Sequence, residues 1–115
     1  MAKETHVDET LITTAFGFEG YRITKQLGIA RGITVRSRSI VGQLGASLQS
    51  IVGGKITAYV SVCEEARDEA YQLMLRDARQ RGANAIIGMR FDATELAENM
   101  TEVLCYGTAV VVVQE

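Results

Sequence analysis

The chain has 115 residues, of which 47% are apolar and 23% are charged, and it contains no proline. This length suits one compact domain, and this composition excludes a disordered, collagen-like or transmembrane chain. Twelve Lys and Arg residues against fourteen Asp and Glu residues give a formal net charge of −2. A chain with so little excess charge is not expected to bind nucleic acid by electrostatic attraction.

The start of the chain lacks the apolar segment of a secretory signal, and the longest strongly apolar run, 109–113, is too short to cross a membrane. We therefore expect a cytoplasmic protein with no membrane partner, in which Cys63 and Cys105 stay reduced. The polar, acidic residues 1–12 are interpreted as a loosely ordered arm that precedes a single domain over 13–115.

Apolar and polar residues alternate over 21–35, which predicts a strand that faces one core with its odd-numbered side chains. Two glycines interrupt this pattern, Gly28 and Gly32, and glycine is a poor strand residue. They indicate a bend, a bulge or a turn that splits the segment into two strands. The apolar odd-numbered positions are Tyr21, Ile23, Leu27, Ile29, Ile33 and Val35.

Two helices are predicted after this strand. Apolar residues recur at helical spacing over 40–52, between a possible N-cap at Ser39 and a stop at Gly53. A longer helix is predicted over 57–81, with Thr57 or Ser61 as its cap and Gly82 as its stop. The apolar stripe of this longer helix consists of Val60, Cys63, Ala66, Ala70, Leu73, Met74 and Ala78.

Strands are predicted over 85–93 and again from 102 or 103 to 113, with a polar connection over 95–101 between them. Both faces of the last strand are apolar, so both must be covered. Two helices cover only one face of a sheet of three or four strands. A second copy of the chain is the simplest cover for the other face, which predicts a homo-oligomer.

Several short motifs, in order along residues 13–113, resemble the YbjQ family of small bacterial and archaeal proteins, whose activity is not established and which are often labelled "putative heavy-metal-binding". The resemblance implies an α+β subunit with a mixed or antiparallel sheet, in the dodecin-like order β-α-α-β-β, that assembles with itself into a ring, a pentamer. One departure is Gln49-Ser50, where relatives often carry an Arg-Asp pair. The motifs that carry the resemblance are Ile51-Val52-Gly53-Gly54-Lys55, Tyr59, Arg81-Gly82-Ala83-Asn84-Ala85-Ile86-Ile87-Gly88 and Tyr106-Gly107-Thr108-Ala109-Val110, together with Thr13-Thr14, Glu19-Gly20-Tyr21-Arg22-Ile23 and Leu27-Gly28.

A metal site is weakly indicated by the residues themselves, because paired Cys or His spacings are missing and the single histidine, His6, lies in the arm. Cys63 and Cys105 are the weak candidate ligands for a divalent or soft metal ion. They would need to converge around the axis of a ring. The alternative is that both are ordinary buried apolar residues.

The segment Gly53-Gly54-Lys55, with Tyr59 nearby, is the candidate ligand site, because backbone N–H groups at the start of a helix favour anions. It lacks the full phosphate-loop pattern, and a tight turn between two helices explains the glycines equally well. No catalytic constellation is visible. The sequence favours a binding or scaffolding protein, with metal or ligand binding between subunits as the alternative and an enzyme with an inter-subunit site as the weakest.

Overall fold

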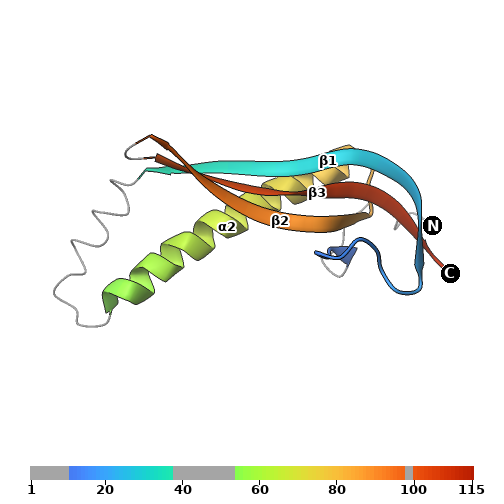
Figure 1. Ribbon diagram of the computed structural model, residues 1–115, viewed down its shortest axis with the longest axis horizontal. Coiled ribbons are helices and arrows are strands. Elements are labelled where there is room, and N and C mark those ends of the chain that lie inside the picture. Colours follow the sequence, from blue (N-terminus) through green and yellow to red (C-terminus); the bar gives the residue numbers. More distant parts are fainter. Residues whose placement is uncertain (1–10, 38–53, 98–99) are drawn as a thin grey trace.

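The computed structural model describes residues 11–37, 54–97 and 100–115. Its elements follow in the order β1 (Tyr21–Ser37), α2 (Gly54–Gln80), β2 (Ala85–Ala97) and β3 (Met100–Gln114). The strands form one antiparallel sheet in the order β1-β3-β2, and α2 lies across one face (Figure 1). The α+β class is confirmed. The described residues hold one helix rather than two, and the helix predicted over 40–52 lies outside them.

The two hairpin strands β2 and β3 are longer than predicted, and the polar connection expected over 95–101 is wrong. β2 continues to Ala97 and β3 begins at Met100, with Thr94 opposite Glu102 and Glu95 opposite Thr101. Strand pairing uses backbone groups, so exposed polar side chains do not end it. The apolar pattern therefore predicted only the part of the hairpin that contributes to a core.

The prediction that the odd-numbered side chains of 21–35 face one core is wrong. Two register shifts interrupt its pairing with β3, between Ile23 and Lys25 and between Gln26 and Ile29, and Gly28 has φ 90° at the second. Each extra residue moves the following side chains to the opposite face of the sheet. Only the stretch between the two shifts is therefore inverted, and there Leu27 packs in the core under α2. The second shift restores the original alternation, so beyond Gly28 the even-numbered residues are buried under α2 and the odd-numbered apolar ones are exposed on the other face. Of the alternatives predicted at the two glycines, a bulge is found at Gly28, and β1 is not split into two strands.

The main core lies between the second half of α2 and the sheet. Gly32 on β1 permits close contact there, because a Cβ at this position would lie 2.1 Å from the carbonyl oxygen of Ala70. The predicted stripe of α2 is buried at its C-terminal end but not at its start, where Val60 is 54% exposed and Cys63 is exposed. The fully buried residues of this core include Ala30, Ala70, Met74, Ala78, Ile86, Cys105 and Ala109.

Both predicted N-caps of α2 lie inside the helix, since it begins at Gly54, ahead of Thr57 and Ser61. The predicted stop is confirmed. Gly82 has φ 85°, its N–H donates to the carbonyl of Arg79, and the N–H of Ala83 donates to the carbonyl of Ala78. This pair of bonds is the Schellman motif, which satisfies the last carbonyls of a helix.

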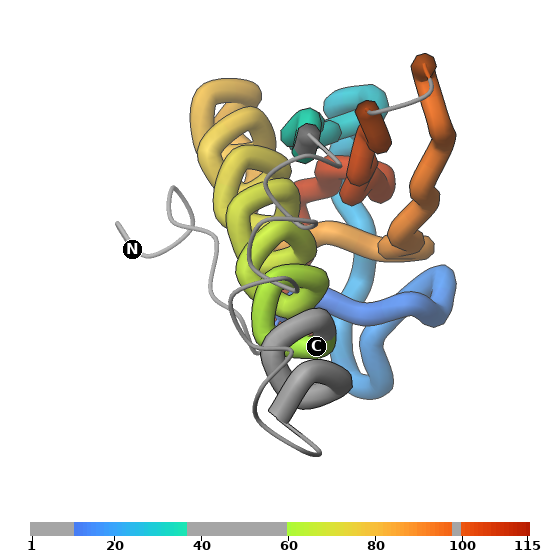
Figure 2. The backbone as a smooth tube through the Cα atoms, turned by 90° about the vertical axis from the view of Figure 1, so that its left-hand side faces the viewer, coloured from blue at the N-terminus to red at the C-terminus, as the bar shows by residue number. Residues whose placement is uncertain are grey.

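A smaller core lies on the sheet face away from α2, around Val110 and Val112 of β3. Residues 11–18 cover it, since Leu11 and Phe18 pack against these valines. The same segment runs beside the edge of β2, where the N–H of Thr13 donates to the carbonyl of Ile86 at 3.1 Å (Figure 2). The prediction that β3 is apolar on both faces is confirmed. At this end of the strand, the chain itself provides cover on both faces.

The molecule is elongated, with extents of 56 × 27 × 23 Å and a radius of gyration of 17.4 Å, against about 13 Å for a compact domain of this length. The first half of α2 diverges from the sheet and projects beyond it, as Figure 1 shows. In the described part of the chain, no helix combines the length and the apolar character that a membrane span requires.

Candidate functional site

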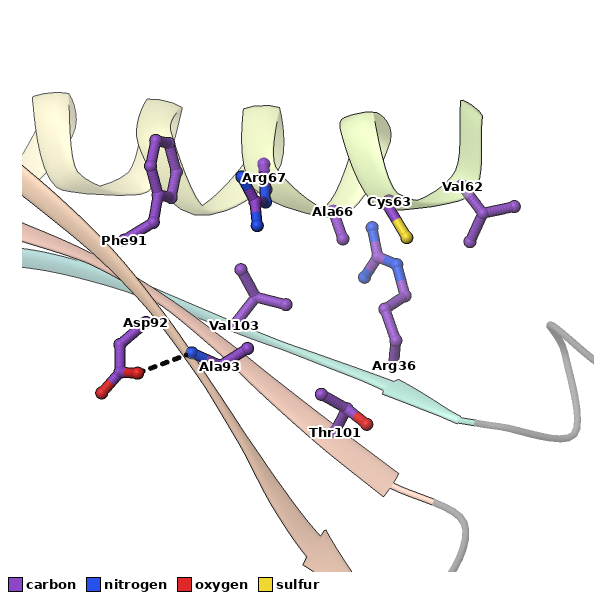
Figure 3. A pocket seen from close by; sticks show the side chains of 10 residues that line it. All are labelled: Arg36, Val62, Cys63, Ala66, Arg67, Phe91, Asp92, Ala93, Thr101 and Val103. Carbon is purple, nitrogen blue, oxygen red and sulfur yellow. Dashed lines mark hydrogen bonds between the residues drawn. The ribbon is translucent and has the colours of Figure 1, made fainter. Parts of the chain in front are cut away.

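The divergence of α2 from the sheet leaves a wedge-shaped cavity of about 420 Å³ between them, referred to below as the wedge cavity (Figure 3). Val62 and Ala66 of α2 line one side. Phe91 and Ala93 of β2 and Val103 of β3 line the other. The walls are therefore mainly apolar, which is typical of a site for a small organic molecule.

Arg36 brings a positive charge into the wedge cavity from the end of β1 (Figure 3). Its Nη1 donates to the hydroxyl of Thr34 at 2.8 Å and to Glu69 Oε1 of α2 at 3.1 Å. The Thr34 hydroxyl also donates to Glu69. These contacts, first the hydrogen bond from Thr34 and then that from Arg36, hold the pKa of the Glu69 carboxyl below its usual value.

Arg67 of α2 provides the second cation, with its guanidinium carbon 5.5 Å from the centre of the Phe91 ring. This distance is that of a cation–π contact, which orients the guanidinium and shields one face of the ring. Asp92 also lines the cavity, but its carboxylate points away from α2 and accepts a hydrogen bond from the N–H of Ala93 at 2.9 Å (Figure 3).

The opposite face of the sheet carries a second feature, a shallow groove of about 340 Å³ over β1 and β3. The odd-numbered residues of β1 beyond its second bulge place apolar side chains here. Charged residues of both signs, including Arg31 and Glu102, lie among them. We call this surface the open sheet face and define it by Ile29, Ile33, Val35, Leu104 and Tyr106.

The two cysteines lie in different environments. Cys105 is fully buried beside Met74, at 3.6 Å between the two sulfur atoms, and burial raises the pKa of its thiol to about 11. Cys63 is exposed and lines the wedge cavity, so the interpretation of both as buried apolar residues is wrong for Cys63. The described residues contain no cluster of three or more His, Cys, Asp or Glu side chains suited to a metal ion.

The predicted ligand site falls at the start of α2. Gly54, Lys55 and Tyr59 belong to its first two turns, and Gly53 lies outside the described residues. Gly54 and Lys55 are therefore part of the helix and do not form a turn before it. A ligand at these residues remains a prediction.

Sequence reasoning missed the cationic residues of the wedge cavity, Arg36 and Arg67. Neither lies in a motif, and each resembles an ordinary charged surface residue. The one available signal was the placement of Arg67 between buried Ala66 and Ala70, close to the apolar stripe of the helix. No local pattern indicated that α2 leaves the sheet at this point.

The described residues form an α+β fold, with one long helix on a three-stranded antiparallel sheet. A family model described as "Putative heavy-metal-binding" matches residues 10–113, so the chain belongs to the YbjQ family. It is 64% identical over 103 residues to a UPF0145 protein of Burkholderia thailandensis, covering 90% of this chain and 93% of that one. A UPF0145 protein of Burkholderia mallei is 63% identical over 103 residues, with the same coverage of both chains.

A solved structure from Pediococcus pentosaceus has a similar fold. That protein belongs to the DUF74 family and is of unknown function, with a TM-score of 0.50 and 18% sequence identity. The match covers 90% of this chain and 96% of the other. At this identity the likeness concerns the fold alone.

Proposed function

We propose that the chain is a binding or scaffolding protein that works as a homo-oligomer, in which another copy covers the open sheet face. The exposure of the apolar row on β1 supports this proposal. Ile29 is 60% exposed, Ile33 44% and Val35 42%. Several large apolar side chains exposed along one strand are typical of an interaction surface.

The charges on this face suit a second copy of the same chain. Arg31 of β1 is cationic, and Glu102 of β3 and Asp92 of β2 are anionic, all along one groove. A surface that carries both signs can pair with an identical or neighbouring surface without net repulsion. The ring of five copies rests on the family resemblance alone and is part of the proposal.

The open sheet face is less buried than the end of the sheet that residues 11–18 cover. There Val110 is fully buried and Val112 is 3% exposed. Leu104 and Tyr106, farther along β3, line the groove and are only partly buried. The same strand therefore has its cover within the chain at one end, and the proposal supplies the missing cover at the other end.

Light scattering coupled to size-exclusion chromatography tests the proposal on the full chain at micromolar concentration. We expect the mass of two or more chains of 12.5 kDa each. Placing a charge in the apolar row with Ile33→Glu should weaken association at least tenfold, which corresponds to about 1.4 kcal/mol. The matched control is Gln72→Glu, the same added charge on the exposed side of α2. A folded wild-type monomer at this concentration would overturn the proposal.

A further inference from the structure

We propose that the wedge cavity binds a small amphipathic organic anion, with an apolar body about the size of one or two rings and one carboxylate. The inference concerns residues of a single chain and does not rest on the proposed assembly. The proposed site is also separate from the ligand site predicted at Gly53, Gly54, Lys55 and Tyr59, because other residues line the wedge cavity.

The size and walls of the cavity define the apolar part of the ligand. A volume of about 420 Å³ lies within the range of small-molecule sites, roughly 300–1,000 Å³. Phe91, 37% exposed on the sheet side, offers an aromatic surface, and Val62 of α2 lies across the cavity from the sheet (Figure 3). Phe91 and Val62 lie at opposite ends of the cavity in Figure 3, so an apolar group inside it would remove part of this lining from water.

The charges define the polar part of the ligand. Two guanidinium groups, those of Arg36 and Arg67, reach the cavity from opposite sides (Figure 3). The anionic groups that the structure describes nearby do not cancel both, because the Asp92 carboxylate points away and the ion pair of Glu69 is with Arg36. The remaining positive charge favours an anion and disfavours an amine.

The hydrogen-bonding capacity of the two arginines points to a carboxylate. Within the described part of the chain, the bonds of Arg36 to Thr34 and Glu69 both use Nη1. A guanidinium has five N–H donors in a planar fork, and no contact among the described residues uses the donors on Nε and Nη2 of Arg36, which suit a ligand. The guanidinium carbon of Arg67 lies 5.5 Å from the centre of the Phe91 ring. A cation–π attraction does not use the N–H groups as hydrogen-bond donors to oxygen, so they can donate to a carboxylate.

Two probes of one shape test this inference. Binding of 2-naphthoate and of uncharged 2-naphthylmethanol to the full wild-type chain is measured by calorimetry and by ¹⁵N NMR titration. We expect naphthoate to bind at least tenfold more tightly than the alcohol and to shift the amides of residues 62–67 and 91–93. The inference is overturned if naphthoate fails to bind at millimolar concentration, if both probes bind equally, or if the shifts lie elsewhere.

Two substitutions test whether the position of Arg67, and not the net charge of the chain, favours binding of the anion. Arg67→Gln should weaken naphthoate binding about tenfold and leave binding of the alcohol unchanged. Arg76→Gln, the matched control, removes the same charge from an exposed position of the same helix and should leave both unchanged. An equal effect of the two substitutions would contradict the inference.

A bulky substitution tests the location without changing charge. Val62→Trp should fill the cavity and abolish naphthoate binding, whereas Gln72→Trp on the exposed side of α2 should not. Far-ultraviolet circular dichroism of each variant checks that it is folded. Unchanged binding in a folded Val62→Trp variant would place the ligand outside the cavity and overturn the inference. Because light scattering measures assembly separately, the two proposals can fail independently.

Discussion

The two halves of α2 meet the sheet in different ways, and the size of the facing residues explains the difference. The second half packs closely, with Gly32 of β1 against the backbone at Ala70. The first half faces Arg36, whose long side chain lies between strand and helix (Figure 3). The helix-facing residues of β1 increase in size toward its end, from Ala30 and Gly32 through Thr34 to Arg36.

This gradient in size indicates how one chain can combine a rigid core with an open site. Small residues allow the backbones to approach and bury apolar surface, which stabilises the fold. Large charged residues hold the helix away from the sheet and leave room between them. The close-packed core and the proposed binding site thus lie at opposite ends of one helix.

The cysteines give the largest expected contrast between the two ends. Cys105 belongs to the close-packed end, and with a thiol pKa of about 11 only about one molecule in a thousand carries the thiolate at pH 8. Burial also blocks access to this sulfur. We expect Cys63 to react with a disulfide reagent such as DTNB at least a hundredfold faster than Cys105 in the native chain.

The reaction with DTNB should have a fast phase and a slow phase, and cysteine variants show which thiol reacts in each. Cys63→Ser should remove the fast phase, and Cys105→Ser should retain it. Denaturant should make both thiols react fast in the wild-type chain, because unfolding exposes Cys105 and lowers the pKa of its thiol to the usual value. Two native phases of equal rate would contradict the assignment of the cysteines to different environments.

Gly32→Ala is the next largest test and concerns the close-packed end. The added Cβ would lie 2.1 Å from the carbonyl oxygen of Ala70 and 2.5 Å from the backbone nitrogen of Met74, so the helix itself must shift. Overpacking against backbone is expected to cost about 3 kcal/mol, roughly a hundredfold in the folding equilibrium. Urea denaturation measures this loss.

The control for this substitution is Gly17→Ala, since a Cβ at Gly17 meets nothing within 4 Å. We expect it to change the free energy of unfolding by less than about 0.5 kcal/mol. Similar losses for the two substitutions would mean that the close approach of α2 to β1 does not limit stability.

The sequence predicted elements better than it predicted faces. The long helix and its Gly82 stop were predictable because apolar spacing and capping are local properties. The burial of β1 was not, because two bulges invert the alternation between them and place Leu27 under α2. Gly28 marks only the second of these bulges. The alternating pattern over 21–35 led to the prediction of a single core face, and the structure divides these residues between two faces.

The candidate site was less predictable than the fold. The wedge cavity depends on the angle between α2 and the sheet, which no single segment specifies. Cys63 illustrates the difficulty, because it lies on the apolar stripe of α2 and is nevertheless exposed where the helix leaves the sheet. The apolar stripe predicts which side of a helix can be buried, and the neighbouring elements decide how much of it is buried.

The smallest expected effect concerns the Glu69 carboxylate, which connects the two ends through Thr34 and Arg36. Its pKa is lowered in the folded chain from 4.5, so ionisation stabilises the fold above the unfolded-state pKa. This contribution is lost as the pH falls through the lower folded-state pKa. Glu69→Gln should therefore lower the melting temperature slightly near neutral pH, and the difference from wild type should shrink toward about pH 3.

The effect should be small because the Glu69 side chain is 50% exposed, and water screens exposed ion pairs. Glu65→Gln, at an exposed position one turn earlier in α2, is the matched control for the loss of one negative charge. Only the difference between the two variants reports the contacts with Thr34 and Arg36. If that difference is the same at about pH 3 as at neutral pH, the ionised carboxylate does not contribute to holding the strand and the helix together at the mouth of the wedge cavity.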